Sequence, residues 1–150
     1  MKFVKTADLK IGMRLAKPIY NKKGVLLYDR NSQLTQQGIE SVRNFHLLGI
    51  FVLEPAEPLP PISEEDLEFE KFQMVTVFNV EDELQAILTK GKGLKLYNIA
   101  ELIISKFGHF DHKINFIQNL RSGEDFVYKH SLNTAILSAL ICNKLKLRGQ

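Results

Sequence analysis

The chain is poor in cysteine and has no long apolar run. Its 150 residues include one cysteine, Cys142, which excludes a disulfide within the chain. No apolar stretch reaches the ~18 residues that a membrane-spanning helix needs. The opening sequence MKFVKTADLK also lacks the apolar core of a secretion signal. We therefore expect a cytoplasmic protein without a membrane span.

The chain also has little excess charge. Its net charge is +3, and its basic residues are scattered apart from a cluster formed by Lys90, Lys92 and Lys95. This cluster lacks the GxxxxGK[ST] spacing of a phosphate-binding loop, and no aromatic stacking pattern accompanies it. We interpret it as a solvated loop and expect no nucleic-acid partner.

The composition is that of a globular protein, with 45% apolar and 25% charged residues. The pattern along the chain changes once, and it predicts an α+β fold in three parts. Residues 1–53 form a small α+β module, residues 54–63 a linker, and residues 64–150 an all-helical segment. The linker holds four of the five prolines, which fix the backbone and remove amide donors.

The module is predicted to contain a β-hairpin, a helix and a further strand. The hairpin spans residues 13–31 around the turn sequence NKKG. Residues 34–48 carry apolar side chains at helical spacing, with Thr35 as the candidate N-cap and Gly49 as the stop. The β-branched and aromatic run at 50–54, IFVLE, predicts the strand.

Four helices are predicted after the linker. Ser63, followed three residues later by Asp66, is a capping-box variant at the start of the first. The second is expected at 98–108, with an asparagine cap and a glycine stop, and the third at 111–123. The fourth runs from about residue 125 to residue 147.

The fourth helix is apolar on all sides between Ala135 and Cys142. A helix of this kind belongs in the centre of a bundle and has to be covered on every side. The cover comes either from helices that are not part of this chain or from a second copy of it, so we expect a homodimer through the helical segment. Cys142, inside the apolar run, is predicted to be a buried packing residue.

Two segments of the chain resemble a known family. The sequence DFVYKHSLNTAILSALICNKLKL resembles the opening helix of HD-GYP domains, a branch of the HD superfamily of metal-dependent phosphohydrolases. The matching residues are Phe126, Tyr128, His130, Ser131, Asn133 and Leu147. The N-terminal residues resemble the small module often found ahead of such domains. Those matches lie at Leu9–Met13, Gly24–Leu27 and Leu34–Thr35.

By this resemblance, the complete protein would hydrolyse the phosphodiester bond of cyclic di-GMP with clustered divalent metal ions, iron or manganese. Such metals make hydroxide available near neutral pH and neutralise developing charge. The first metal ligand of the family falls on His130. The His-Asp pair and the Gly-Tyr-Pro motif of the family are absent from these 150 residues. We therefore assign no catalytic residue and expect this chain alone to be inactive and without tightly bound metal.

Two further observations qualify the metal site. Family members with a third metal carry a glutamate four residues before the histidine, and this chain has Phe126 there, which favours two metals. From spacing alone, His130 is also compatible with a polar residue satisfied at a helix N-terminus. His109, Asp111 and His112 have a spacing too local for a convincing metal site, and we interpret them as capping and surface residues.

A second interpretation belongs to another class of protein. The chain would be a stand-alone regulatory or protein-interaction module that dimerises through its helices and has no catalytic role. The two interpretations differ in the codons expected after Gln150 in the parent gene. The first requires a His-Asp pair and a Gly-Tyr-Pro motif, and a stop codon there would exclude it.

Overall fold

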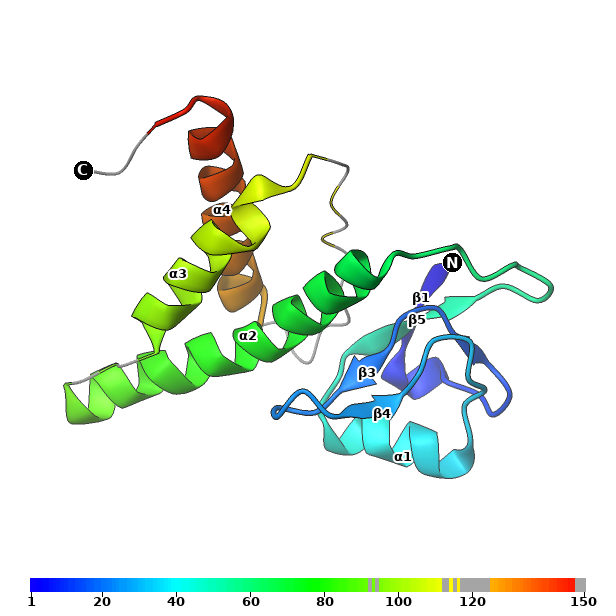
Figure 1. The fold of residues 1–150 in the computed structure, drawn as a ribbon. Coiled ribbons are helices and arrows are strands. Elements are labelled where there is room, and N and C mark those ends of the chain that lie inside the picture. The colour runs from blue at the N-terminus through cyan, green and yellow to red at the C-terminus, as the bar shows by residue number, and fades with distance from the viewer. Residues whose placement is uncertain (92, 94, 112–113, 115, 117–124, 148–150) are drawn as a thin grey trace.

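Figure 1 shows the computed structural model of the chain, in which a small sheet-containing module is followed by long helices. The fold is α+β, and this confirms the predicted fold class. The structure describes residues 1–91, 93, 95–111, 114, 116 and 125–147.

The N-terminal module is made of short strands and one α-helix. In chain order its elements are β1 (Lys2–Lys5), η1 (Thr6–Asp8), β2 (Arg14–Leu15), β3 (Ile19–Tyr20), β4 (Leu26–Tyr28), α1 (Gln36–Asn44) and β5 (Gly49–Leu53). β5 is the central strand of an antiparallel sheet with the order β1-β5-β2, and β3 pairs with β4 separately. Ile39 and Val42 of α1 pack with Ile50 and Val52 of β5 in the core of the module.

The predicted strand at residues 50–54 is confirmed as β5, which begins one residue earlier. Its partner β1 is not evident from the sequence, because lysines at both ends interrupt the apolar pattern. Val4 is the buried residue of β1 and pairs with Ile50, while Phe3 pairs with Phe51. Hydrogen bonding to β5 therefore makes β1 a strand, more than its own apolar content does.

The predicted hairpin is confirmed for its turn and its inner ends. The Asn21 side chain accepts hydrogen bonds from the N–H groups of Lys23 and Val25, and Gly24 has a positive φ of 75°. The outer end of its first strand is different. Arg14–Leu15 is a separate strand, β2, that pairs with β5. Pro18 follows closely, and a proline cannot donate a hydrogen bond to a continuous ladder.

Helix α1 begins as predicted and ends earlier than predicted. The Thr35 hydroxyl accepts a hydrogen bond from the N–H of Gly38 at 3.0 Å, which confirms the N-cap. The helix ends at Asn44, and His46 takes a positive φ of 54°. Gly49 is not the stop but the first residue of β5. A Cβ atom there would lie 2.3 Å from the carbonyl oxygen of Val4, so close strand pairing requires glycine.

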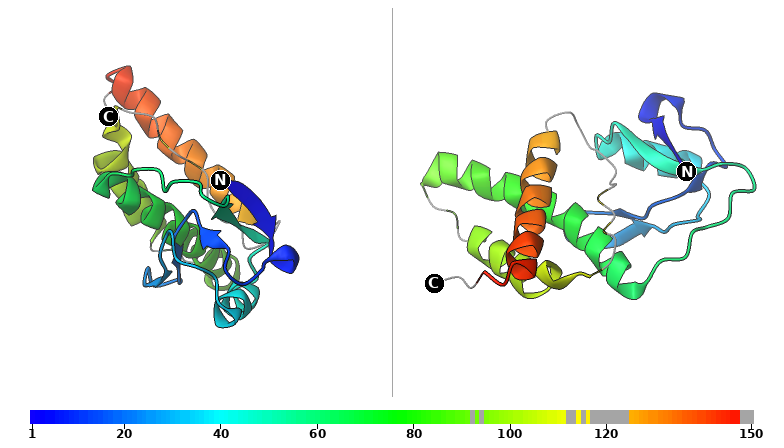
Figure 2. Two further views of the ribbon diagram at one scale, coloured as in Figure 1. Left: turned by 90° about the vertical axis from the view of Figure 1, so that its right-hand side faces the viewer. Right: turned by 90° about the horizontal axis from the view of Figure 1, so that it is seen from above.

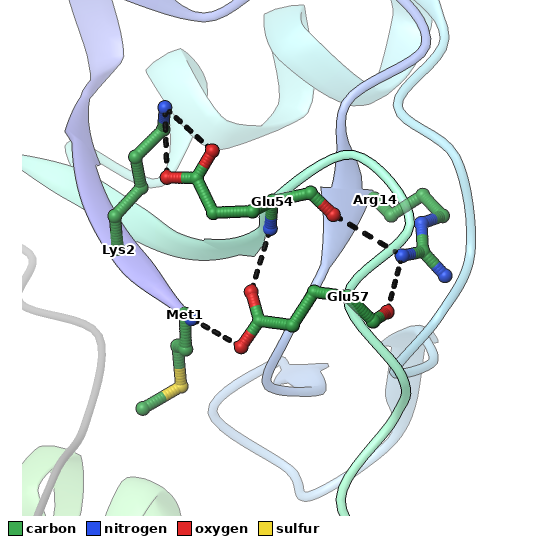
Figure 3. Close-up of polar contacts among 5 residues, drawn as sticks. All are labelled: Met1, Lys2, Arg14, Glu54 and Glu57. Carbon is green, nitrogen blue, oxygen red and sulfur yellow. Dashed lines mark hydrogen bonds and ion pairs between the residues drawn. The ribbon is translucent and has the colours of Figure 1, made fainter.

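The first residues of the proline-rich linker are fastened to the sheet (Figure 3). The amino group of Met1 and the N–H of Glu54 both donate to the Glu57 carboxylate. These hydrogen bonds hold the pKa of Glu57 below its usual range. Arg14 donates to the carbonyl oxygens of Glu54 and Glu57, and Lys2 pairs with the Glu54 carboxylate at 3.0 Å. The linker therefore leaves the module as an ordered turn.

The helical segment contains three α-helices and one short 3-10 turn in its described part. They are α2 (Glu64–Lys90), α3 (Leu96–Ser105), η2 (Phe107–His109) and α4 (Asp125–Lys144). The Ser63 hydroxyl accepts from the N–H of Asp66 at 3.1 Å, which confirms the predicted cap, and Gly91 ends α2 in the left-handed conformation. In Figure 2, α4 crosses α2. Among the described helices, none combines the length and apolarity that crossing a membrane would take.

The predicted start of α3 at Asn98 is wrong by two residues. Leu96 is its first residue, and the N–H of the preceding Lys95 donates to the Glu83 carboxylate of α2 at 2.8 Å. The start of α3 is therefore held by this contact with α2 and not by the predicted cap at Asn98. The helix predicted at 111–123 lies mostly outside the described residues.

Phenylalanine rings form the core of the helical segment. The Phe69 ring of α2 lies 5.2 Å from Phe107 and 5.3 Å from Phe110, measured between centroids. Leu132 and Ile136 of α4 cover this cluster and are buried. Edge and tilted aromatic pairs of this kind add roughly 0.5–1.5 kcal/mol each beyond the area they bury. The cluster therefore ties α2, η2 and α4 together.

One glutamine of this segment is buried, and its amide has no hydrogen-bond partner among the described residues. Gln73 of α2 is fully buried, and neither its amide nitrogen nor its amide oxygen has a hydrogen-bond partner in the described part of the chain. Burying an unpaired amide costs roughly 1–3 kcal/mol. We therefore expect Gln73→Met to raise the free energy of unfolding by about that amount, measured by urea denaturation.

The control for this prediction is Gln85→Met, at an exposed position of the same helix. Its effect should stay within about 0.5 kcal/mol. If Gln73→Met instead destabilised the chain while Gln85→Met did not, the Gln73 amide would be paired in solution, for example with an internal water.

Candidate functional site

The candidate site lies on helix α4, which has two different faces. One face is buried against the rest of the helical segment through Leu132 and Ile136. Asp125, at the N-terminal end of the helix, is also buried on this side. The inner face therefore holds α4 in place and leaves the opposite face for other contacts.

The opposite face of α4 is an apolar surface exposed to solvent, which we call the outer stripe. Its apolar residues form one pair near the start of the helix and a second pair near its end, with the exposed Thr134 between them, and their exposed fractions lie between 46% and 64%. They are Phe126, Val127, Leu137 and Ile141. The run from Ala135 to Cys142, predicted to be apolar on all sides, thus has Ile136 on the buried face and Leu137 and Ile141 on the exposed face, and the predicted cover stays a prediction. Large apolar side chains exposed on one helix face are typical of an interface.

His130 lies within the outer stripe and is exposed. Its ring stacks on that of Phe126, one turn earlier, with the centroids 5.8 Å apart and the planes 16° from parallel. No described residue is hydrogen-bonded to its imidazole. Among the described residues, His130 therefore has no partner that would make it a satisfied capping residue.

The position four residues before His130 is filled by an aromatic ring. Phe126 shares the outer face with the histidine, whereas Asp125 lies on the buried side of the helix. Asp125 would therefore reach the direction of position 126 only if the helix rotated about its own axis. The geometry agrees with the residue pattern in leaving no carboxylate one turn before the histidine.

His130 fits a metal as one ligand and does not form a site by itself. In the portion of the chain that the structure describes, no group of three or more histidine, cysteine, aspartate or glutamate side chains comes together to hold a metal ion. A neutral imidazole on a rigid helix is a suitable single ligand, but a bound divalent ion needs several protein donors. The described residues therefore hold no metal site at His130.

The second histidine group has a structural role in the described residues. The Asn143 amide of α4 lies 3.0 Å from the Nδ1 atom of His109 and donates to the carbonyl oxygen of Gly108 at 3.0 Å. These contacts join η2 to the end of α4. His112 lies outside the described residues, so the predicted surface role of this group stays a prediction there.

The prediction that Cys142 is buried is wrong. Its side chain is exposed, because it lies on the flank of α4 that no described element covers. An apolar sequence neighbourhood indicates burial only when a second element packs on the same side of the helix.

One lysine of the predicted cluster, Lys95, takes part in a wider groove. The groove, of about 540 Å³, lies between α2, α3 and the hairpin turn, and Lys23, Lys71 and Lys106 also line it. Lys106 pairs with Glu68, and Lys71 lies over the ring of Tyr20 at 5.9 Å. Two of its cations are therefore already engaged. Lys92 lies outside the described residues. The groove was not predicted, because its lysines come from separate elements.

No family model, curated protein or solved structure matches this chain. A functional assignment therefore rests on the geometry of α4 and on the residue pattern around His130.

Proposed function

We propose that the chain is the N-terminal regulatory and dimerisation portion of a metal-dependent cyclic di-GMP phosphodiesterase of the HD-GYP type. In this proposal α4 is the first helix of the catalytic bundle, and His130 is its first metal ligand. The observation that carries the proposal is the outer stripe of α4, where an accessible imidazole lies among exposed apolar side chains.

Elements that pack over the outer stripe would bury its apolar side chains and would also bring further metal ligands close to His130. Apolar side chains on the surface of a helix are stabilised when another element removes them from water, by roughly 25 cal/mol per Å². Any helices that cover Leu137 and Ile141 also approach His130, because all three lie on one face. The same packing would then bring additional donors to the imidazole and shield the site from bulk water.

The chemistry assigned to residues of this chain is limited to holding and orienting a ligand. A bound pair of metal ions would supply a hydroxide nucleophile and neutralise charge on the phosphodiester. His130 would offer one nitrogen of a neutral imidazole to a metal. The ring of Phe126, with its centroid 5.8 Å from that of the imidazole, would restrict the orientation of the imidazole. A cytoplasmic location is part of this proposal and suits an exposed free thiol at Cys142.

The test is to extend the chain and assay it. The parent gene should encode a His-Asp pair and a Gly-Tyr-Pro motif soon after codon 150. The complete protein, purified with iron or manganese, should hydrolyse cyclic di-GMP, whereas the 150-residue chain should not. A complete protein that carries both motifs but shows no hydrolysis with either metal would contradict the proposal.

The outer stripe also favours the alternative, a stand-alone regulatory or interaction module that dimerises through its helices. In that case two copies would bury Leu137 and Ile141 against each other. Light scattering should then show a dimer of the 150-residue chain, and Leu137→Asp combined with Ile141→Asp should convert it to a monomer. A stop codon directly after Gln150 would select this alternative, and a monomeric wild-type chain would exclude it.

A further inference from the structure

The groove between α2, α3 and the turn that joins β3 to β4 has the dimensions of a small-molecule site. Its volume is about 540 Å³, within the roughly 300–1,000 Å³ that such sites usually have. Direct contacts join the three segments. A Cβ atom on Gly24 in the turn would lie 3.1 Å from Cε of Lys71 and 3.3 Å from Cγ2 of Val75, so the turn packs on α2. The N–H of Lys95 joins the start of α3 to the Glu83 carboxylate of α2.

Positive charge dominates the groove. Its described lining residues include four lysines and a single carboxylate, that of Glu68. The lysines are Lys23, Lys71, Lys95 and Lys106. The formal charge of these five side chains is +3. It is still +2 when the Glu83 carboxylate is added, which contacts the backbone of Lys95 and is buried. A ligand with negative charge matches this excess.

Three of the four ammonium groups have no carboxylate partner in the described part of the chain. Lys106 is paired with Glu68, and the other three are exposed. We call these three the rim lysines: Lys23, Lys71 and Lys95. Lys71 also lies over the ring of Tyr20, a contact that leaves its three N–H donors without an acceptor. An ammonium is a compact point charge that commonly binds phosphate, so the rim lysines suit a phosphate or a comparable anionic group.

The floor of the groove is apolar. Phe72, Val75 and Ile99 are half-buried there, and Leu102 is 42% exposed. The ring of Phe107, which is buried, lies 4.3 Å from that of Phe72 between centroids and supports the floor from within. Covering apolar surface that is open to water is favourable by roughly 25 cal/mol per Å². The floor therefore favours a ligand that carries an apolar body beside its anionic group.

We propose that this groove binds a small amphipathic organic anion, with its apolar body on the floor and its phosphate, or an equivalent anionic group, among the rim lysines. The site does not depend on the proposed phosphodiesterase role, because none of its lining residues belongs to α4. The ligand touches the turn of the module as well as α2 and α3. It therefore stabilises the packing of the module on the helices, by RT ln(1 + [L]/Kd) if it binds the folded state alone.

The experiment titrates the 150-residue chain with naphthyl phosphate, followed by calorimetry and thermal melting. We expect saturable binding of one molecule per chain, which weakens as salt is added because the rim lysines are exposed. Inorganic phosphate, which has no apolar body, and naphthol, which has no charge, should bind at least about tenfold more weakly. Absence of saturable binding would overturn the proposal, and so would equal binding of phosphate or naphthol.

A variant of the rim tests the role of its charges. Removing all three rim charges should weaken binding roughly 10- to 100-fold, because each exposed charge contributes only a few-fold. The three substitutions are Lys23→Gln, Lys71→Gln and Lys95→Gln. The matched control removes three charges from exposed positions outside the groove and should bind normally. Its substitutions are Lys5→Gln, Lys10→Gln and Lys144→Gln. Equal weakening in both triple variants would show an effect of net charge alone and contradict the proposal.

A variant of the floor tests the place of the apolar body. Leu102→Asp replaces an exposed apolar side chain of the groove by a negative charge and should weaken binding more than about tenfold. Ile104→Asp, at a 63% exposed position of the same helix outside the groove, is the matched control and should bind normally. Equal affinities of these two variants would place the ligand elsewhere.

Vesicles distinguish a free anion from the same anionic group in a lipid surface. The chain should sediment with phosphatidylcholine vesicles that contain phosphatidic acid no more than with pure phosphatidylcholine. Sedimentation with the acidic vesicles, without binding of naphthyl phosphate, would make the groove a membrane-binding surface and overturn the proposal.

Discussion

Replacing His130 by alanine in the complete protein is expected to lower kcat for cyclic di-GMP by more than about a hundredfold. Losing a residue that merely orients a metal ligand already costs roughly 10–100-fold in metal affinity or activity, and His130 is proposed to be a ligand itself. The metal content per chain, measured by elemental analysis, should fall in parallel. Both losses are expected from the position of His130 on the outer stripe, where elements packed over α4 would meet it.

The matched control for this prediction is Ser138→Ala, an exposed position two turns further along α4, which should keep its activity. In the 150-residue chain, His130→Ala should change the free energy of unfolding by no more than about 0.5 kcal/mol. Ile136→Ala, on the buried face, should cost about 2–5 kcal/mol. A fully active His130→Ala protein would refute the ligand assignment. A large loss of stability would show that the histidine has a structural role.

Replacing Lys17 by methionine is expected to destabilise the chain by about 3–5 kcal/mol, because it leaves the Glu70 carboxylate buried and unpaired. Lys17 and Glu70 form an ion pair with exposed fractions of only 8% and 5% for their side chains. Glu70→Met should have a similar effect for the reverse reason. The double replacement should restore most of the stability, because no buried charge then remains.

The physical reason is that the two charges lose water in order to pair. Burial, assisted by the neighbouring charge of Arg30 and opposed by Asp66, lowers the pKa of Lys17 to about 8. The cost of removing water from the ammonium thus exceeds the favourable interactions that the ammonium makes with its surroundings. Lys17 nevertheless stays mostly protonated at pH 7. A well-packed apolar pair of similar volume avoids this cost, and such replacements are often neutral or stabilising.

The control is the exposed pair formed by Lys106 and Glu68, whose side chains are 47% and 60% exposed. Water screens this pair, so Glu68→Gln should have little effect on the free energy of unfolding. Urea denaturation of the four variants of the Lys17–Glu70 cycle gives the coupling energy directly. Equal losses in the double and single variants would contradict the expected coupling. A loss in Glu68→Gln as large as in Glu70→Met would contradict the role of burial.

Much of the fold is encoded in local sequence. The caps at Thr35 and Ser63 and the turn at Asn21–Gly24 depend on side chains that act within a few residues of themselves. Their geometry is therefore available to sequence reasoning. The apolar run from Ala135 to Cys142 likewise predicted a helix that is apolar on almost all sides. His130 became a candidate ligand through the resemblance to HD-GYP domains, since its spacing alone is also compatible with a polar residue at a helix N-terminus.

The sequence by itself determined the α+β class and the order of the main elements, while its resemblance to HD-GYP domains suggested His130 as a ligand. Only the tertiary structure decided which side chains are buried and which distant residues come into contact. It made a strand of Lys2–Lys5 by pairing it with β5, and it left Cys142 exposed on an uncovered flank of α4. It also brought Lys17 and Glu70 into contact across 53 residues of sequence. Burial and long-range charge pairing depend on which surfaces pack together, and that information does not lie in any single stretch of the chain.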